Sequence, residues 1–61
     1  MSAPKDPFML LSWTNMKLRD LYPSLSELSA AESVNEEEIR QKLEQAGYFY
    51  DSEKNQFVIR A

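Results

Sequence analysis

The chain contains no cysteine and no histidine, and it has a single glycine among its 61 residues. Without cysteine it can form neither a disulfide nor a thiolate metal site. Without histidine it lacks the commonest general base, and carboxylate oxygens are the metal ligands that remain. Its serines have no histidine partner for nucleophilic catalysis. We therefore expect a protein that is not an enzyme and that holds neither a cofactor nor a metal.

The chain also lacks a long apolar run and an excess of positive charge. Its longest bulky apolar run, residues 8–11, is far too short to span a bilayer, and it has neither the charged flank nor the cleavage site of a signal peptide. The net charge of −3 at pH 7 disfavours non-specific binding to nucleic acid or to an anionic membrane. These features predict a cytoplasmic protein without a membrane partner, and they count against a nucleic-acid partner without excluding one.

The hydrophobic content is sufficient for one small core. Hydrophobic residues make up 43% of the chain and aromatic residues 11%. A chain of this length buries only about 60% of the surface that its unfolded form exposes, so we expect one domain and no more. Residues 1–5 are expected to be a disordered leader, and residues 6–60 a single small globular domain.

Capping residues and prolines delimit the first expected helix. Asp6 can accept hydrogen bonds from free backbone N–H groups, and Pro7 suits the first helical position. Pro23 disfavours helical geometry at the residue before it. The first helix is therefore predicted over residues 7–21.

Two shorter helices are predicted to follow. Ser24 and Glu27 form a capping box at the start of the second helix. Asn35 and Glu38 repeat that pattern at the start of the third helix. Gly47, the single glycine, stands where a left-handed helix cap is needed.

The hydrophobic period changes from 3.6 to 2 near the C-terminus. Residues 48–50 and 57–59 are aromatic and β-branched, and the polar segment 51–56 between them is turn-forming. We therefore predict an α+β fold, with three short helices followed by a C-terminal β-hairpin, that is winged helix-turn-helix-like. The expected core consists of Leu10, Leu11, Leu18, Leu21, Leu25, Leu28, Ile39, Leu43, Tyr48, Phe57 and Ile59.

The first helix carries two apolar stripes at 100° per residue. The leucines form a broad stripe that should pack on the other helices. Met9, Trp13 and Met16 form a second ridge. Either the hairpin covers this ridge, or the ridge stays exposed and binds a protein partner, for which a second copy in a homodimer is the commonest case.

The winged-helix resemblance raises nucleic-acid binding as an alternative. Arginine and glutamine can read base edges, so Arg40, Gln41 and Gln45 on the third helix are the candidate readers. Lys54 in the hairpin turn could contact phosphate. Against this, residues 36–46 carry four glutamates and only two cationic side chains, whereas a reader of DNA needs cations to hold the phosphates.

Several stretches carry a resemblance to a known family. They are Asp6–Ser12, Asn15–Asp20, Gly47-Tyr48, Tyr50-Asp51 and Asn55–Phe57. From about residue 6 to residue 58 the chain resembles a family of very short bacterial proteins, domain of unknown function 4250. The resemblance implies a bacterial, stand-alone, single-domain protein, and it implies no activity, cofactor or functional residue.

Asn15 lies in the most distinctive of these stretches and is polar on a largely apolar helix. A buried amide needs hydrogen-bond partners, so we expect its side chain to bond backbone groups where the first helix meets the second helix or the hairpin. The alternative is a recognition contact with a partner.

These observations together predict a small bacterial domain of unknown function that acts as a non-catalytic protein–protein interaction module. Met9, Trp13 and Met16 are its expected contact residues. The alternative is a winged-helix-like regulatory domain that binds nucleic acid through Arg40 and its neighbours.

Overall fold

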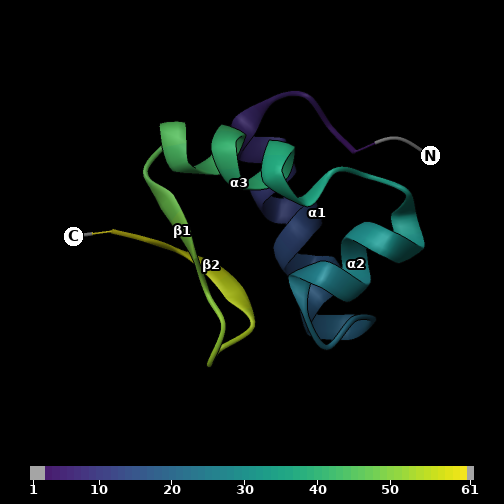
Figure 1. Ribbon diagram of the computed structural model, residues 1–61. Helices are drawn as coiled ribbons and strands as arrows, with labels where there is room; N and C mark the ends of the chain where they lie inside the picture. Colours follow the sequence, from purple (N-terminus) through teal and green to yellow (C-terminus); the bar gives the residue numbers. More distant parts are fainter. Residues whose placement is uncertain (1–2, 61) are drawn as a thin grey trace.

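Three helices and a two-stranded antiparallel hairpin follow one another in the computed structural model, which describes residues 3–60 (Figure 1). The helices are α1 (Pro7–Asp20), α2 (Leu25–Glu32) and α3 (Glu36–Gln45), and the strands are β1 (Tyr48–Asp51) and β2 (Gln56–Ile59). The predicted α+β class and element order are thereby confirmed, whereas the winged-helix resemblance stays a prediction. In Figure 1, the hairpin lies to one side of the helices, with α2 on the opposite side.

The predicted caps hold the start of each helix. The Asp6 carboxylate accepts hydrogen bonds from the backbone N–H groups of Phe8 and Met9 at 3.1 and 3.0 Å. Ser24 accepts from the N–H of Glu27, and Asn35 accepts from the N–H of Glu38. Each cap satisfies N–H groups that have no partner within the helix. After α3, Gly47 adopts a φ of 93°, which a residue without a Cβ reaches at little cost.

Nine of the eleven predicted core residues lie in the core or against it. Leu11 and Tyr48 are half-buried and pack on the others. Two polar residues that were not predicted as core, Thr14 and Ser29, are also buried, and neither hydroxyl has a hydrogen-bond partner within residues 3–60. The fully buried hydrophobic residues are Leu10, Leu18, Leu25, Leu28, Ile39, Leu43 and Phe57.

The prediction was wrong for Leu21 and Ile59, which are 62% and 69% exposed. Leu21 was placed by extending the helical period to residue 21, but α1 ends at Asp20 and Leu21 is its C-cap. Tyr22 packs against the core instead. Ile59 ends β2 on the same face as Phe57, but a two-stranded sheet offers it one cross-strand neighbour, Tyr48. The rest of the Ile59 side chain is uncovered.

Two asparagines attach the hairpin to α1. The Asn15 amide donates to the Phe57 carbonyl at 3.1 Å and accepts from the Phe57 N–H at 2.8 Å. The Asn55 amide donates to the carbonyls of Leu18 and Tyr22 at 3.1 and 2.9 Å. The expectation that Asn15 bonds backbone at the hairpin junction is confirmed, and its side chain satisfies both backbone groups of Phe57 on the β2 edge that faces α1.

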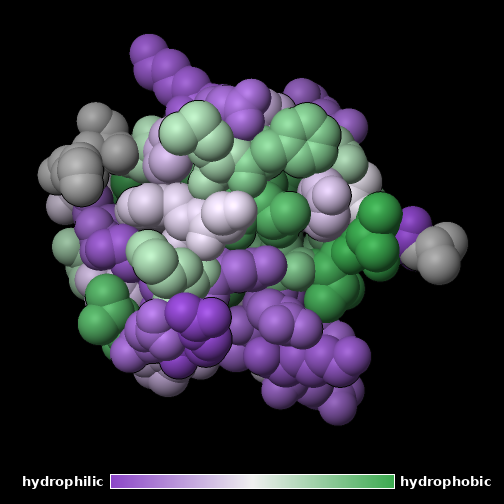
Figure 2. Space-filling view, turned by 180° about the vertical axis from the view of Figure 1, so that it is seen from behind, coloured by the Kyte–Doolittle hydropathy of each residue, from purple (hydrophilic) through white to green (hydrophobic). Residues whose placement is uncertain are grey.

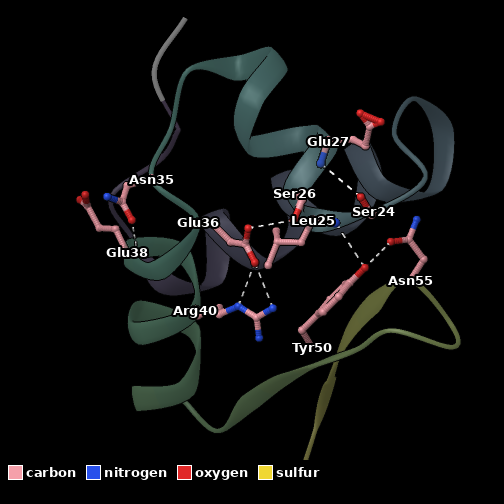
Figure 3. A network of polar contacts seen from close by, with 10 residues as sticks. All are labelled: Ser24, Leu25, Ser26, Glu27, Asn35, Glu36, Glu38, Arg40, Tyr50 and Asn55. Carbon is pink, nitrogen blue, oxygen red and sulfur yellow. Dashed lines mark hydrogen bonds and ion pairs between the residues drawn. The ribbon is translucent and has the colours of Figure 1, made fainter.

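Tyr50 extends this attachment to α2. Its hydroxyl donates to the Asn55 side-chain oxygen at 2.7 Å and accepts from the Leu25 N–H at 3.3 Å. Figure 3 shows the tyrosine reaching from the hairpin toward the start of α2, with Asn55 beside its hydroxyl. One side chain therefore ties the hairpin turn to a helix start.

The segment before α1 was predicted to be a disordered leader. Residues 1 and 2 lie outside the described residues, and Ala3 packs against the core. Within residues 3–60, no helix has both the length and the apolar character that crossing a lipid bilayer requires.

Candidate partner-binding surface

One face of α1 is buried and the opposite face is apolar but exposed. Leu10, Thr14 and Leu18, at spacings of four residues, form the buried line. On the opposite face, Phe8, Met9 and Met16 are 64%, 63% and 45% exposed. Seven residues turn a helix by almost two full turns, which aligns Met9 with Met16 on one side.

This exposed face carries no charge over most of its length. The sequence from Pro7 to Met16 has no ionisable side chain, in a chain of which 28% is charged. Ser12, also exposed, lies between the two methionines. We call Phe8, Met9, Ser12 and Met16 the outer face of α1. Figure 2, the view from behind, shows hydrophobic side chains in the upper middle and at the right of this side of the molecule, with hydrophilic ones along the upper rim and the lower edge.

Trp13 forms the border of the outer face toward α2. It is half-buried and packs against the core. The Lys17 ammonium lies 5.7 Å from the Trp13 ring centroid and 3.3 Å from the Glu32 carboxylate on α2. The Tyr22 hydroxyl also donates to Glu32, at 2.7 Å. The Tyr22 hydrogen bond, and then Lys17, lower the pKa of the Glu32 carboxyl, and the same hydrogen bond raises the pKa of Tyr22.

The hairpin packs on the other flank of α1 and leaves both methionines uncovered. Its attachment runs through Asn15 and Phe57, whereas Met9 and Met16 remain exposed. Met9 and Met16 are therefore exposed, as in the second of the two interpretations of this ridge. Trp13 is partly buried, but it packs against the hydrophobic core and is not covered by the hairpin.

An open groove of about 640 Å³ runs between α1 and the hairpin turn. Met16 and Ser12 lie on its α1 side, so the outer face continues into it. Lys54 and Arg19 both line the groove, and Arg19 is already paired with Asp20 at 2.9 Å. That hydrogen bond raises the pKa of Arg19 and lowers the pKa of Asp20.

The candidate nucleic-acid residues are spread over different parts of the surface. Arg40 is half-buried, and its guanidinium donates to Glu36 at 3.0 and 3.3 Å while lying 5.6 Å from the Tyr50 ring centroid (Figure 3). Gln41 and Gln45 are exposed on α3. Lys54 lines the groove beside α1.

The acidic start of α3 has structural partners. Glu36 accepts a hydrogen bond from Ser26 in addition to those from Arg40. Glu38 pairs with Lys42 at 3.6 Å, at the favourable i,i+4 spacing. Within residues 3–60, no group of three or more potential metal-ligating side chains comes together.

Sequence reasoning placed neither Ser12 nor Phe8 among the contact residues, and of these two Phe8 is the apolar one. Its spacing of four residues from Ser12, and of eight from Met16, was the signal that could have revealed it. Phe8 belongs to the apolar run at residues 8–11, and within that run the prediction assigned the buried Leu10 to the core.

Comparison with known proteins identifies a family. The model of the family described as domain of unknown function (DUF4250) matches residues 4–57. The chain therefore belongs to this family, as its motifs predicted. No curated protein and no solved structure matches the chain.

Proposed function

We propose that this member of the DUF4250 family is a non-catalytic module that binds another protein through the outer face of α1. The observation that supports this proposal is the exposure of Phe8, Met9 and Met16 on one uncharged helix face. Contiguous exposed apolar side chains are characteristic of interaction sites.

The chemistry of the face suits an apolar protein surface as its partner. Interface centres are depleted of charge and enriched in aromatic residues and methionine. Methionine side chains adapt to irregular surfaces because they are unbranched and polarisable. Trp13 at the border offers a rigid aromatic contact whose exposed part a partner can cover. The charged pairs at Lys17 and Arg19 would then form the polar rim.

Site-specific photo-crosslinking tests the proposal. A photoreactive amino acid replaces Ser12 in one variant and Glu44, exposed on α3, in the control variant. In cells of the source organism, we expect Ser12 to give discrete protein adducts that Glu44 does not give. A Met9→Glu, Met16→Glu double substitution should remove these adducts, while circular dichroism shows that the chain stays folded.

Two outcomes would contradict the proposal. Equal adduct patterns at Ser12 and Glu44 would mean that the outer face has no preferred partner. Adducts that persist in the folded double variant would mean that the methionines do not contribute to binding. Either result would assign the exposed apolar side chains no binding role.

A further inference from the structure

We infer that β1 accepts an extended segment of another protein as a third strand of the sheet. The surface concerned is the open edge of β1, the side of the strand that faces away from β2. Because β2 is the strand that faces α1, the open edge lies on the far side of the sheet from α1. It would be a second binding surface, independent of the outer face of α1.

The ladder shows which backbone groups of the hairpin point outward. β1 and β2 pair antiparallel in one continuous register. Just before β1, the Gly47 carbonyl accepts a hydrogen bond from the Arg60 N–H at 3.0 Å, and hydrogen-bonded positions recur every two residues along an antiparallel pair. Phe49 therefore bonds β2, whereas Tyr48 and Tyr50 direct their N–H and C=O groups toward the open edge.

The corresponding edge of β2 is filled by a side chain. Phe57 lies opposite Tyr50 in the register, so its backbone groups also point outward, on the α1 side. Both of them bond the Asn15 amide, at 2.8 and 3.1 Å, which is independent evidence for the outward pattern. Among residues 3–60, the backbone groups of Tyr48 and Tyr50 at the open edge have no such partner, and Tyr50 bonds α2 and Asn55 through its hydroxyl.

Apart from its short length, β1 has none of the features that usually keep an edge strand from pairing. Such strands are commonly protected by lysine, by proline or by a bulge that bends the strand away. Tyr48–Asp51 contains neither lysine nor proline, and its register with β2 has no bulge. An extended backbone presents N–H and C=O groups at the two-residue spacing that this edge offers. The hydrogen-bonding pattern therefore specifies a strand as the occupant.

The side chains beside the edge indicate what the added strand carries. Phe49 is half-buried and points to the face of the sheet opposite to that of Tyr50, so an apolar side chain on the added strand would pack beside it. The Arg60 guanidinium lies 5.0 Å from the Phe49 ring centroid on that face, and within residues 3–60 it forms no ion pair. An acidic side chain would pair with it. The segment is therefore extended, with an apolar and an acidic residue two positions apart.

Peptide selection tests the inference. A phage-displayed library of random peptides is selected against the immobilised natural chain. We expect the selected peptides to alternate apolar residues and to carry an acidic residue two positions from one of them. Added to the labelled chain, they should slow hydrogen exchange at the Tyr48 and Tyr50 N–H groups at least about tenfold, because both groups become hydrogen-bonded.

Two chemically synthesised chains isolate the contribution of the edge. In one, an ester replaces the Tyr50 amide and removes an outward N–H from β1. In the matched control, an ester replaces the Ile59 amide and removes an outward N–H from β2. Each ester weakens one carbonyl of the bonded Phe49–Val58 pair, so both chains should lose similar stability, which circular dichroism checks. We expect the Tyr50 ester to bind the peptides at least about fivefold more weakly than the Ile59 ester.

Three results would overturn the inference. The first is a selection that yields no peptide. The second is a set of peptides that bind both esters equally well, and amide shifts at Phe8, Met9 and Met16 would then place them on the outer face of α1 and uphold the proposed function alone. The third is hydrogen exchange at Tyr48 and Tyr50 that slows as the free chain is concentrated, because a second copy would then occupy the edge.

Discussion

At the scale of single residues, the two asparagines of the family motifs, Asn15 and Asn55, hold the hairpin against α1. Asn15 bonds both backbone groups of Phe57, and Asn55 bonds the carbonyl of Leu18 in the last turn of α1 and that of Tyr22 just after it. Asn55 also adopts a φ of 54°, a left-handed conformation that asparagine tolerates better than most residues. These contacts give both side-chain amides a structural role within the fold, so neither amide needs a partner molecule to satisfy it.

Replacing Asn15 should loosen the hairpin. In Asn15→Leu the shape is kept, but the Phe57 N–H and C=O lose their partners beside α1. Leaving such groups unsatisfied costs about 1–3 kcal/mol each when buried, and these are partly buried. We expect a loss of about 2 kcal/mol in the free energy of unfolding by urea. Gln56→Leu, on the exposed neighbouring residue, is the control, and equal effects of the two substitutions would disprove the role of Asn15.

Removing the buried hydroxyl of Thr14 should stabilise the protein. Thr14 is fully buried, and its hydroxyl has no hydrogen-bond partner among the described residues. Thr14→Val keeps the branched shape and removes the desolvated oxygen, so we expect a gain of about 1 kcal/mol. For a domain of this size that raises the thermal midpoint by about 4–8 °C. A lower midpoint would show that the hydroxyl bonds a carbonyl of its own helix.

At the scale of elements, local chemistry determined the helix starts and the hairpin. Asp6, Ser24 and Asn35 cap the helices as predicted because a cap depends on residues within one turn. The failures came at element ends. Leu21 and Ile59 have the hydrophobic spacing of their helix and strand, but that spacing does not show how far the neighbouring elements extend over the end of the helix or strand. Whether a residue at such an end is buried therefore depends on the element that packs against it.

The contact between α1 and α2 should make stability depend on acid pH. The pKa of Glu32 is lowered in the folded state by Tyr22 and Lys17. The stabilisation of the folded state by the Glu32 carboxylate is therefore fully present at pH values above the ordinary glutamate pKa of about 4.3. It is lost as the pH falls through the lower pKa that Glu32 has in the folded state. We expect Glu32→Gln to be less stable than the natural chain at pH 7 and to lose less stability between pH 5 and 3.

Urea unfolding at several pH values measures this difference. Glu37→Gln is the matched control, since Glu37 is exposed and forms no ion pair within residues 3–60. The control should follow the natural chain at every pH. Parallel pH curves for Glu32→Gln and the natural chain would contradict a stabilising contact at Glu32.

At the scale of the whole molecule, the sequence could predict the elements and most of their buried residues, but not which apolar face of the first helix stays uncovered. The ridge at Met9, Trp13 and Met16 was visible from spacing alone, and its two interpretations differed only in where the hairpin lies. The Asn15–Phe57 contact, 42 residues apart in sequence, decides this. Arg40 is held by Glu36, at an i,i+4 spacing that the sequence shows, and by the Tyr50 ring of the hairpin. The pairing of Asn15 with Phe57, by contrast, has no local signal in the sequence.

The distribution of charge over the whole molecule leads to the last prediction. We expect no amide shifts when labelled protein is titrated with mixed-sequence duplex DNA at low salt. The net charge is −3, Arg40 is paired with Glu36, and Lys54 lies in a groove away from the exposed glutamines of α3. DNA affinity is dominated by the neutralisation of phosphates by several cations. Within residues 3–60, Arg40 and Lys54 do not lie on one surface that could supply this neutralisation.

A charge-reversed variant shows whether electrostatics alone prevents binding. Glu37→Lys with Glu44→Lys places two cations on the exposed side of α3, and because each change adds two charges, the net charge goes from −3 to +1. If DNA causes small amide shifts in this variant, and added salt removes them, the binding is the non-specific kind that added cations confer. Shifts of the natural chain confined to residues 35–46 and 51–56 would instead establish a winged-helix mode of binding. They would transfer the functional surface from α1 to α3.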